Sequence, residues 1–123
     1  MSCVLRIDVD GSELNHLLEQ SAMPPYRVDR KGEPSCIHFN VSDADFNDLK
    51  LQIVDAISFL KRNEDVLKYV MGHDGVSGGE LDFGVERRDV AVQVDRLPPE
   101  LLRLAGLIDI GVTLSYYDPA EDD

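Results

Sequence analysis

The segment from Ser42 to Arg62 limits the possible folds more than any other part of this chain. Its apolar residues recur at intervals of three and four, the spacing that places side chains on one face of a helix. These residues are Phe46, Leu49, Ile53, Ala56, Ile57 and Leu60. Ser42 is suited to cap the first turn, and Lys61 suits the negative end of the helix dipole. The pattern predicts a long helix whose apolar face packs on a sheet.

Short segments in which apolar and polar residues alternate supply the strands of that sheet. They span residues 3–9, 26–30, 36–41, 80–86, 90–95 and 110–116. Shorter helical patterns follow the first strand and the long helix, and a third precedes the last strand. The predicted order is β-α-β-β-α-β-β-α-β. Since each strand has one apolar face, we expect an α+β fold, with a largely antiparallel or mixed sheet whose helices cover one face.

The length of the chain sets the number of domains. A chain of 123 residues is the size of one ordinary domain and can bury enough surface to fold without disulfides or metals. We expect residues 1–118 to form this single domain. Residues 119–123 are mostly acidic and follow the last strand, so we expect a disordered C-terminal tail.

The charge balance narrows the choice of partner. The chain has 24 acidic and 12 basic residues, a net charge of −12, which argues against nucleic acid and anionic membranes and favours a basic protein. The alternative is that the negative charge only keeps the protein soluble. There is no apolar run long enough to span a membrane, and residues 1–10 lack a signal-peptide pattern. We therefore expect a cytoplasmic protein that does not bind a membrane.

The polar sides of the predicted strands form one candidate binding surface. If the strand phases hold, they share a face of the sheet, with Arg6, Arg27, Asn40, Gln93, Thr113 and Ser115 among the residues on it. The candidate binding residues on this face are Asp8, Asp29, His38, Asp82, Glu86 and Tyr117. Rigid strands would present them to a partner, with an acidic bias that suits a basic one. The alternative is a polar face that only contacts water.

A glycine-rich loop, residues 72–79, is the alternative candidate site. Its glycines would let backbone N–H groups approach an anion, and His73 and Asp74 add a titratable pair. The loop matches neither the phosphate-binding nor the dinucleotide-binding glycine pattern, and a helical segment precedes it where those motifs need a strand. A mobile connector explains the same composition.

Other catalytic and metal-binding patterns are weak. The three histidines, His16, His38 and His73, lie on separate elements without a recognised ligand spacing, so we expect no metal and no cofactor. Cys36 lies two residues from His38 on one strand, but no oxyanion-binding element accompanies the pair, and we assign no catalytic residue. Cys3 and Cys36 should face opposite sides of the sheet as free thiols.

Two stretches resemble a widespread, uncharacterised bacterial domain family. They are Pro25-Tyr26-Arg27-Val28-Asp29-Arg30-Lys31-Gly32-Glu33 and the helix from Leu97 to Ala105 running into the strand Ile110-Gly111-Val112-Thr113-Leu114-Ser115-Tyr116-Tyr117. The similarity in element order covers nearly the whole chain. Some members of this family are candidate immunity proteins of polymorphic toxin systems. The resemblance supplies no catalytic residue, and it implies an α+β fold and a binding role.

Two functions follow from these patterns. The first is a non-enzymatic protein-binding module, of the immunity type, with a cationic partner. The second is a small ligand-binding protein or enzyme that uses the glycine-rich loop with His73. Leu51 and Phe59 fall off the main stripe of the long helix, which is compatible with a contact to residues 64–70 or to another subunit. The sequence therefore leaves the oligomeric state open, with a dimer as one choice.

Overall fold

A computed structural model, which describes residues 1–21 and 23–119, confirms the α+β class. Its elements are β1 (Cys3–Val9), α1 (Leu14–Gln20), β2 (Arg27–Asp29), β3 (Ser35–Ser42), α2 (Leu49–Arg62), α3 (Glu64–Met71), β4 (Val76–Glu86), α4 (Pro99–Leu107) and β5 (Gly111–Tyr117). Nearly all of the predicted acidic tail lies outside the described residues. Among the helices that the structure describes, none has the length and apolar character needed to cross a membrane.

The five strands form one mixed sheet in the order β2-β3-β1-β4-β5. The central strand β1 pairs with β3 on one edge and with β4 on the other, both antiparallel, so that Leu5 lies opposite Phe39 and Leu81. The last strand, β5, runs parallel to β4. A parallel neighbour requires a crossover connection, and the segment that contains α4 provides it. The edge strand β5 is therefore reached only after the chain has left the sheet and passed through α4.

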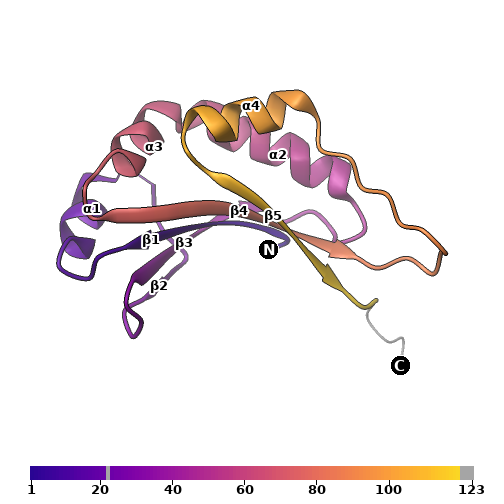
Figure 1. Ribbon diagram of the computed structural model, residues 1–123, viewed down its shortest axis with the longest axis horizontal. Helices are drawn as coiled ribbons and strands as arrows, with labels where there is room; N and C mark the ends of the chain where they lie inside the picture. Colours follow the sequence, from indigo (N-terminus) through magenta and orange to yellow (C-terminus); the bar gives the residue numbers. More distant parts are fainter. Residues whose placement is uncertain (22, 120–123) are drawn as a thin grey trace.

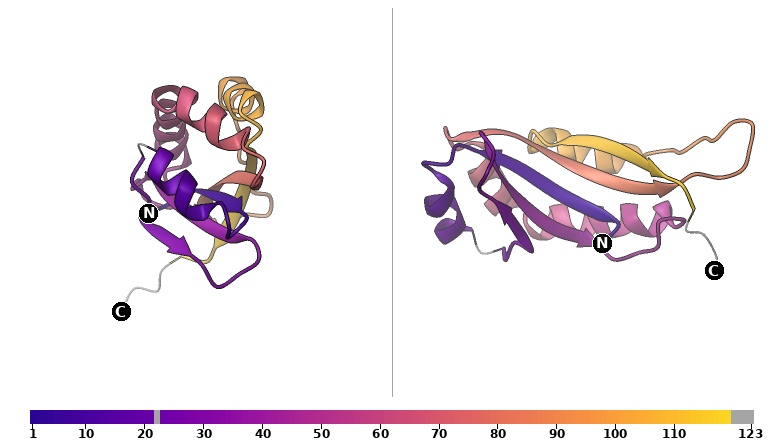
Figure 2. Two further views of the ribbon diagram at one scale, coloured as in Figure 1. Left: turned by 90° about the vertical axis from the view of Figure 1, so that its left-hand side faces the viewer. Right: turned by 90° about the horizontal axis from the view of Figure 1, so that it is seen from below.

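The helices are distributed unevenly over the two sides of the sheet. Figure 1 shows α2, α3 and α4 on one side, and the view from below in Figure 2 shows the strands in front of these helices. The short helix α1 lies at one end of the sheet, where the His16 ring is 5.7 Å from the ring of His73, just after α3. We call the side under α2, α3 and α4 the covered face and the other side the open face.

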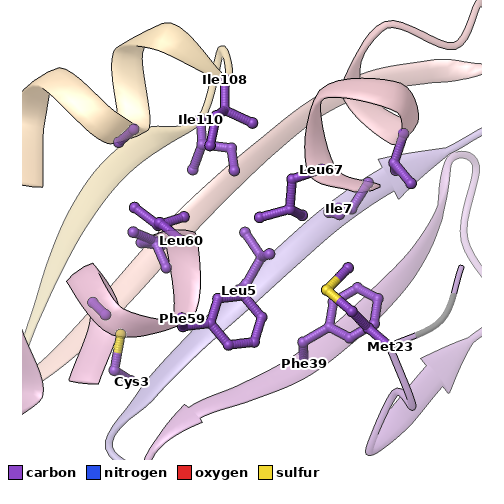
Figure 3. Close-up of a cluster of buried hydrophobic side chains, with 14 of the residues drawn as sticks. Cys3, Leu5, Ile7, Met23, Phe39, Phe59, Leu60, Leu67, Ile108 and Ile110 are labelled. Carbon is purple, nitrogen blue, oxygen red and sulfur yellow. The ribbon is translucent and has the colours of Figure 1, made fainter. Parts of the chain in front are cut away.

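The core lies between the covered face and the helices. Figure 3 shows side chains of β1, β3, α2 and α3 meeting there, with Ile108 and Ile110 from the segment between α4 and β5. Leu5, Leu60 and Leu67 are completely buried. Every second residue of β1 points into this layer, and its four inward residues are all inaccessible to solvent. The predicted apolar face of the first strand is therefore confirmed.

The long helix is present, but it begins seven residues later than predicted. Ser42 is the last residue of β3, and its hydroxyl donates a hydrogen bond of 2.6 Å to Asp55. The side chain of Asp48 caps α2 instead, accepting a hydrogen bond of 3.1 Å from the backbone N–H of Leu51. Phe46, which the periodicity placed on the buried stripe, therefore precedes the helix and is 41% exposed.

Most of the predicted apolar stripe of α2 does pack on the sheet. Ile53, Ala56 and Leu60 are buried, whereas Ile57 is only partly buried. Phe59, which the pattern placed off the stripe, is also buried and belongs to the same core cluster. The buried side of the helix is therefore wider than the stripe, because α4, β3 and α3 all pack against it.

The predicted strand at residues 90–95 is wrong. Residues 87–98, which bend at residues 89–92, lie outside the sheet, and we call them the arm; Figure 2 shows the arm projecting beyond one end of the sheet. Val90, Val92 and Val94 are 54%, 75% and 75% exposed. Gln93, expected on the open face, instead donates a hydrogen bond to the backbone carbonyl of Glu86. The edge of β4 where this strand would have paired is occupied by β5.

The glycine-rich loop is shorter than predicted. Strand β4 begins at Val76, so Gly78 and Gly79 lie within it, opposite Asp8 and Ile7 of β1. Only residues 72–75 connect α3 to the sheet. The two glycines are tolerated in the strand because β1 supplies the backbone pairing, and Gly79 also leaves room for the side chain of Met71.

Candidate functional site

The open face gathers the predicted binding residues on one surface. In the sheet register, Asp8 and Asp29 flank Cys36, and His38 lies between Arg6 and Arg27. Farther along the strands, Asp82 lies opposite Thr113, Gly84 opposite Ser115 and Glu86 opposite Tyr117. The alternation of β1 to β5 therefore places all six candidate residues, Asp8, Asp29, His38, Asp82, Glu86 and Tyr117, on the face that α2, α3 and α4 leave uncovered.

Arg6 is at the centre of this face and joins two carboxylates of β4. Its guanidinium donates hydrogen bonds of 2.9 Å to Glu80 and 2.7 Å to Asp82. The other oxygens of these carboxylates accept hydrogen bonds from Thr113 at 2.9 Å and Ser115 at 2.6 Å. The Asp82 side chain is only 11% exposed. The network therefore links β1, β4 and β5. It gives the carboxylates of Glu80 and Asp82 hydrogen-bond partners that the sequence alone does not identify.

The charges of this network support each other. The hydrogen bond to Glu80 raises the pKa of Arg6, and the hydrogen bonds from Arg6 and then Thr113 lower the pKa of Glu80. Both groups are therefore ionised near neutral pH. A guanidinium held between two carboxylates is poorly suited to bind a further anion. The middle of the open face is a structural network, and the carboxylates of Asp8 and Glu86, which form no ion pair with a described residue, lie outside it.

The remaining polar groups beside Arg6 are not arranged for thiol chemistry. Burial, followed by the charges of Arg27 and Arg6, lowers the pKa of His38, so this imidazole is neutral at pH 7. Burial, followed by the charge of Asp8, raises the pKa of Cys36 to about 11. A nucleophilic cysteine needs a lowered pKa. Cys36 and His38 share a face as predicted, but their environment favours the unreactive thiol.

A hollow lies at the end of the open face, where β4 and β5 finish. Its volume is about 400 Å³, and its lining includes Phe46 and Tyr117, whose rings meet edge to face with centroids 5.5 Å apart. The complete lining, which defines what we call the acidic hollow, is Asp45, Phe46, Asn47, Glu86, Tyr117, Asp118 and Pro119. It combines two aromatic rings with three carboxylates, of which Asp118 forms an ion pair with Arg87 at 3.3 Å, and the other two, with the rings, can bind a cation.

The backbone around Phe46 explains how this ring reaches the open face. The N–H of Glu86 donates to the carbonyl of Phe46 at 2.9 Å, so the segment before α2 continues the pairing of β4 beyond the end of β1. The buried amide of Gln52 donates to the carbonyls of Gly84 and Asp45, which ties this segment to α2. The Phe46 ring then lies over Gly84, where a Cβ atom would overlap it.

The six predicted residues do not contribute equally to this arrangement. Glu86 and Tyr117 line the acidic hollow, Asp82 belongs to the Arg6 network, and Asp8 and Asp29 lie at the other end of the face. Phe46 was not among the predicted site residues, because its spacing placed it on the long helix. Asp48 was the available signal, because aspartate is a favoured N-cap residue and this one directly precedes the apolar Leu49.

The alternative site keeps its residues but changes its geometry. Nδ1 of His73 accepts a hydrogen bond of 3.2 Å from the N–H of Gly75, and Nε2 of His73 lies 3.9 Å from Glu13. Asp74 lines a separate hollow of about 460 Å³ that also includes Asp10 and Glu33. Neither a chain of free backbone N–H groups nor a cationic side chain faces this hollow from the described lining residues. A ligand at this loop stays a prediction.

Metal binding has no support in the part of the chain that the structure describes, where no cluster of three or more histidine, cysteine or acidic side chains is placed to hold an ion. The two cysteines are free, with Cys3 buried and Cys36 partly buried. No protein-family model matches the chain, and no curated protein or solved structure is significantly similar to it. The residues and their geometry are therefore the basis for any functional assignment.

Proposed function

We propose that this protein is a non-enzymatic binding module that recognises a basic protein through the open face. A lysine or arginine side chain of the partner would enter the acidic hollow. The observation that carries this proposal is the lining of the hollow, in which Phe46 and Tyr117 are 41% and 52% exposed beside three carboxylates. Cations interact favourably with aromatic faces and with carboxylates, and the two effects reinforce each other.

The charge of the surrounding surface supports a basic partner. The paired strands of the open face carry two arginines against five carboxylates, an excess of three negative charges: Arg6, Arg27, Asp8, Asp29, Glu80, Asp82 and Glu86. The chain as a whole carries −12. A partner of opposite charge would be attracted before contact, and rigid strands would hold the binding groups without a further ordering cost.

The cellular role is part of the same proposal. The resemblance to a bacterial family that includes candidate immunity proteins agrees with a protein that blocks a basic partner. Free thiols suit a reducing compartment, so we place the protein in the bacterial cytoplasm. In this role the module would act by occupying the partner's basic surface, with no reaction of its own.

A titration with a defined cationic peptide tests the proposal. The probe is a short synthetic peptide of alternating lysine and glycine, added to isotopically labelled protein while backbone amide resonances are recorded. We expect the largest changes at residues 45–47, 84–86 and 115–118. We also expect the affinity to fall as salt is added, because screening weakens the attraction between peptide and protein.

Two variants and one control locate the site. Glu86→Gln and Tyr117→Leu each remove one part of the hollow and should weaken peptide binding by about threefold to fivefold. Glu19→Gln removes the same charge from an exposed position on α1 and should leave the affinity within experimental error. Equal weakening by Glu86→Gln and Glu19→Gln would mean that the net charge alone causes the effect. It would refute a site in the hollow.

A further inference from the structure

The arm carries an unpaired backbone edge. Among the described residues, no group accepts a hydrogen bond from the backbone N–H groups of residues 91–97. The valines on either side of Ala91 and Gln93 project into solvent, with Val92 and Val94 each 75% exposed. The arm bends at residues 89–92, and its Asp95 accepts a hydrogen bond of 3.0 Å from the hydroxyl of Tyr116 in the same chain, a contact that leaves the backbone N–H groups free. Valine favours extended backbone, and an exposed run of such residues with free N–H groups is a template for pairing with another strand.

A second unpaired edge lies at the end of the sheet. Strand β5 pairs only with β4, so its other edge has no neighbouring strand among the described residues. This strand is seven residues long, the same length as the unpaired stretch at residues 91–97. Tyr116 and Tyr117 near its end are 41% and 52% exposed, so apolar surface accompanies the free edge. The lengths and the hydrogen-bonding needs of the two segments match.

Charges at the ends of the two segments select the direction of pairing. Arg96 near the end of the arm is exposed and forms no ion pair with a described residue, and Asp109 lies just before β5. At the opposite ends, Arg88 precedes the arm's unpaired stretch and Asp118 follows β5, but each has a partner in its own chain, Asp95 at 3.3 Å and Arg87 at 3.3 Å. Only an antiparallel arrangement places Arg96 near Asp109. An ion pair between these two residues would favour this direction and oppose slippage of the register.

We propose that two copies of this chain form a dimer in which each arm adds to the β5 edge of the other copy as an antiparallel strand. The two contacts are equivalent under a twofold axis, so the assembly closes at two copies. Each copy would extend its five-stranded sheet by one strand. The strand that the sequence predicts at residues 90–95 would then exist in the dimer, with its backbone partner supplied by the other chain.

The main test compares the mass in solution of the wild-type protein with that of two variants at Val92. Val92→Pro removes one N–H and blocks strand pairing, whereas Val92→Thr keeps the N–H and the branched side chain. We expect sedimentation to show the wild type and Val92→Thr at twice the 13.7 kDa of one chain. Val92→Pro should raise the dissociation constant about a hundredfold. Its circular dichroism should stay unchanged, because the arm lies outside the core.

Hydrogen exchange identifies the surface that pairs. In the dimer, alternate amides within residues 91–97 and the outward amides of β5 should become protected, and the protection should disappear on dilution. A wild-type protein that stays monomeric at millimolar concentration would overturn the proposal. So would a dimer that Val92→Pro leaves intact, or an arm whose protection does not depend on concentration, because the arm would then pair within its own chain.

A charge variant tests the direction of pairing. Arg96→Glu would place a carboxylate near Asp109 of the second copy and should weaken the dimer several-fold. Arg103→Glu makes the same charge change at an exposed position on α4 and should leave the dissociation constant nearly unchanged. Equal effects of the two variants would contradict the antiparallel register.

This dimer and the proposed peptide site can fail separately. Both copies carry −12, so added salt should strengthen the dimer by screening their repulsion, whereas it should weaken binding of the lysine peptide. Val92→Pro should weaken the dimer about a hundredfold while the peptide still shifts resonances around the acidic hollow. Glu86→Gln should weaken peptide binding by about threefold to fivefold and leave the dissociation constant of the dimer unchanged.

Discussion

The two faces of the sheet are built from alternate residues of the same strands, yet different forces stabilise them. On the covered face, Leu5, Leu81 and Phe83 are completely buried under the helices. On the open face, Arg6, one residue after Leu5, is held by ion pairs and hydrogen bonds to β4. Burial of apolar area dominates stability, while partly exposed ion pairs contribute much less. Most of the stability therefore comes from the covered face, and the open face, where we propose recognition, contributes much less to it.

The largest expected effect is on the covered face. Phe83→Ala removes a fully buried ring opposite Leu114 and should lower the free energy of unfolding by about 3–5 kcal/mol, through lost burial and the remaining cavity. Urea unfolding followed by circular dichroism measures this loss. The matched control is Asp8→Ala on the open face, which should change the stability by less than about 0.5 kcal/mol. Similar losses in the two variants would show that both faces contribute to the core.

A smaller effect is expected at the centre of the open face. Arg6→Met keeps much of the apolar volume but removes the hydrogen bonds to Glu80 and Asp82, and it should cost about 1–2 kcal/mol at pH 7. Thr113→Val, which removes one neutral donor to Glu80 and keeps the shape, is the control and should cost less. An Arg6→Met protein as stable as the wild type would show that the network contributes no net stability.

The pH dependence of the stability of Arg6→Met tests whether the interaction between Arg6 and Glu80 stabilises the fold. The pKa of Glu80 is lowered in the folded state, so its stabilising contribution is present above its ordinary value of 4.5 and is lost as the pH falls through the lowered pKa. The wild-type protein should therefore lose stability on acidification below pH 4.5. Arg6→Met should lose less over the same range, because the main cause of the lowered pKa is gone.

The smallest effect is a difference in thiol reactivity between the faces. Cys36 on the open face should react with a water-soluble thiol reagent in the folded protein, but slowly, because its pKa is raised to about 11. Cys3 on the covered face is inaccessible and should react only after unfolding. Mass spectrometry of the labelled protein at increasing pH checks both statements. Labelling of Cys3 at the same rate as Cys36 would mean that the covered face opens in the native state.

The arm and β5 explain why one strand prediction failed. Residues 90–95 and residues 110–116 both alternate apolar and polar side chains, and the first lies much closer to β4 along the chain. The edge of β4 can accept only one neighbour, and β5 takes it as a parallel strand after the crossover through α4. Alternation indicates that a segment can be a strand, but pairing depends on which segment packs better under the helices.

In the candidate site, too, the sequence pattern predicts which face a side chain occupies but does not predict its contacts. The face of each paired candidate residue was predictable, because side chains in a strand alternate with a period of two. The partners of these residues were not predictable, since the contact between Arg6 and Asp82 depends on the order β3-β1-β4. Phe46 was also missed, because its place on the open face depends on the pairing of its carbonyl with Glu86, forty residues away.

The sequence by itself determined the α+β class, the inward face of β1 and the main helix α2, because these depend on local periodicity and on burial of apolar side chains. The tertiary structure alone decided that β5 takes the edge of β4, that residues 90–95 project as an arm and that Phe46 meets Tyr117. These outcomes are competitions between distant segments for the same neighbours. No local pattern records which segment wins, since the free energy that decides it comes from contacts formed only when the whole sheet and its helices are in place.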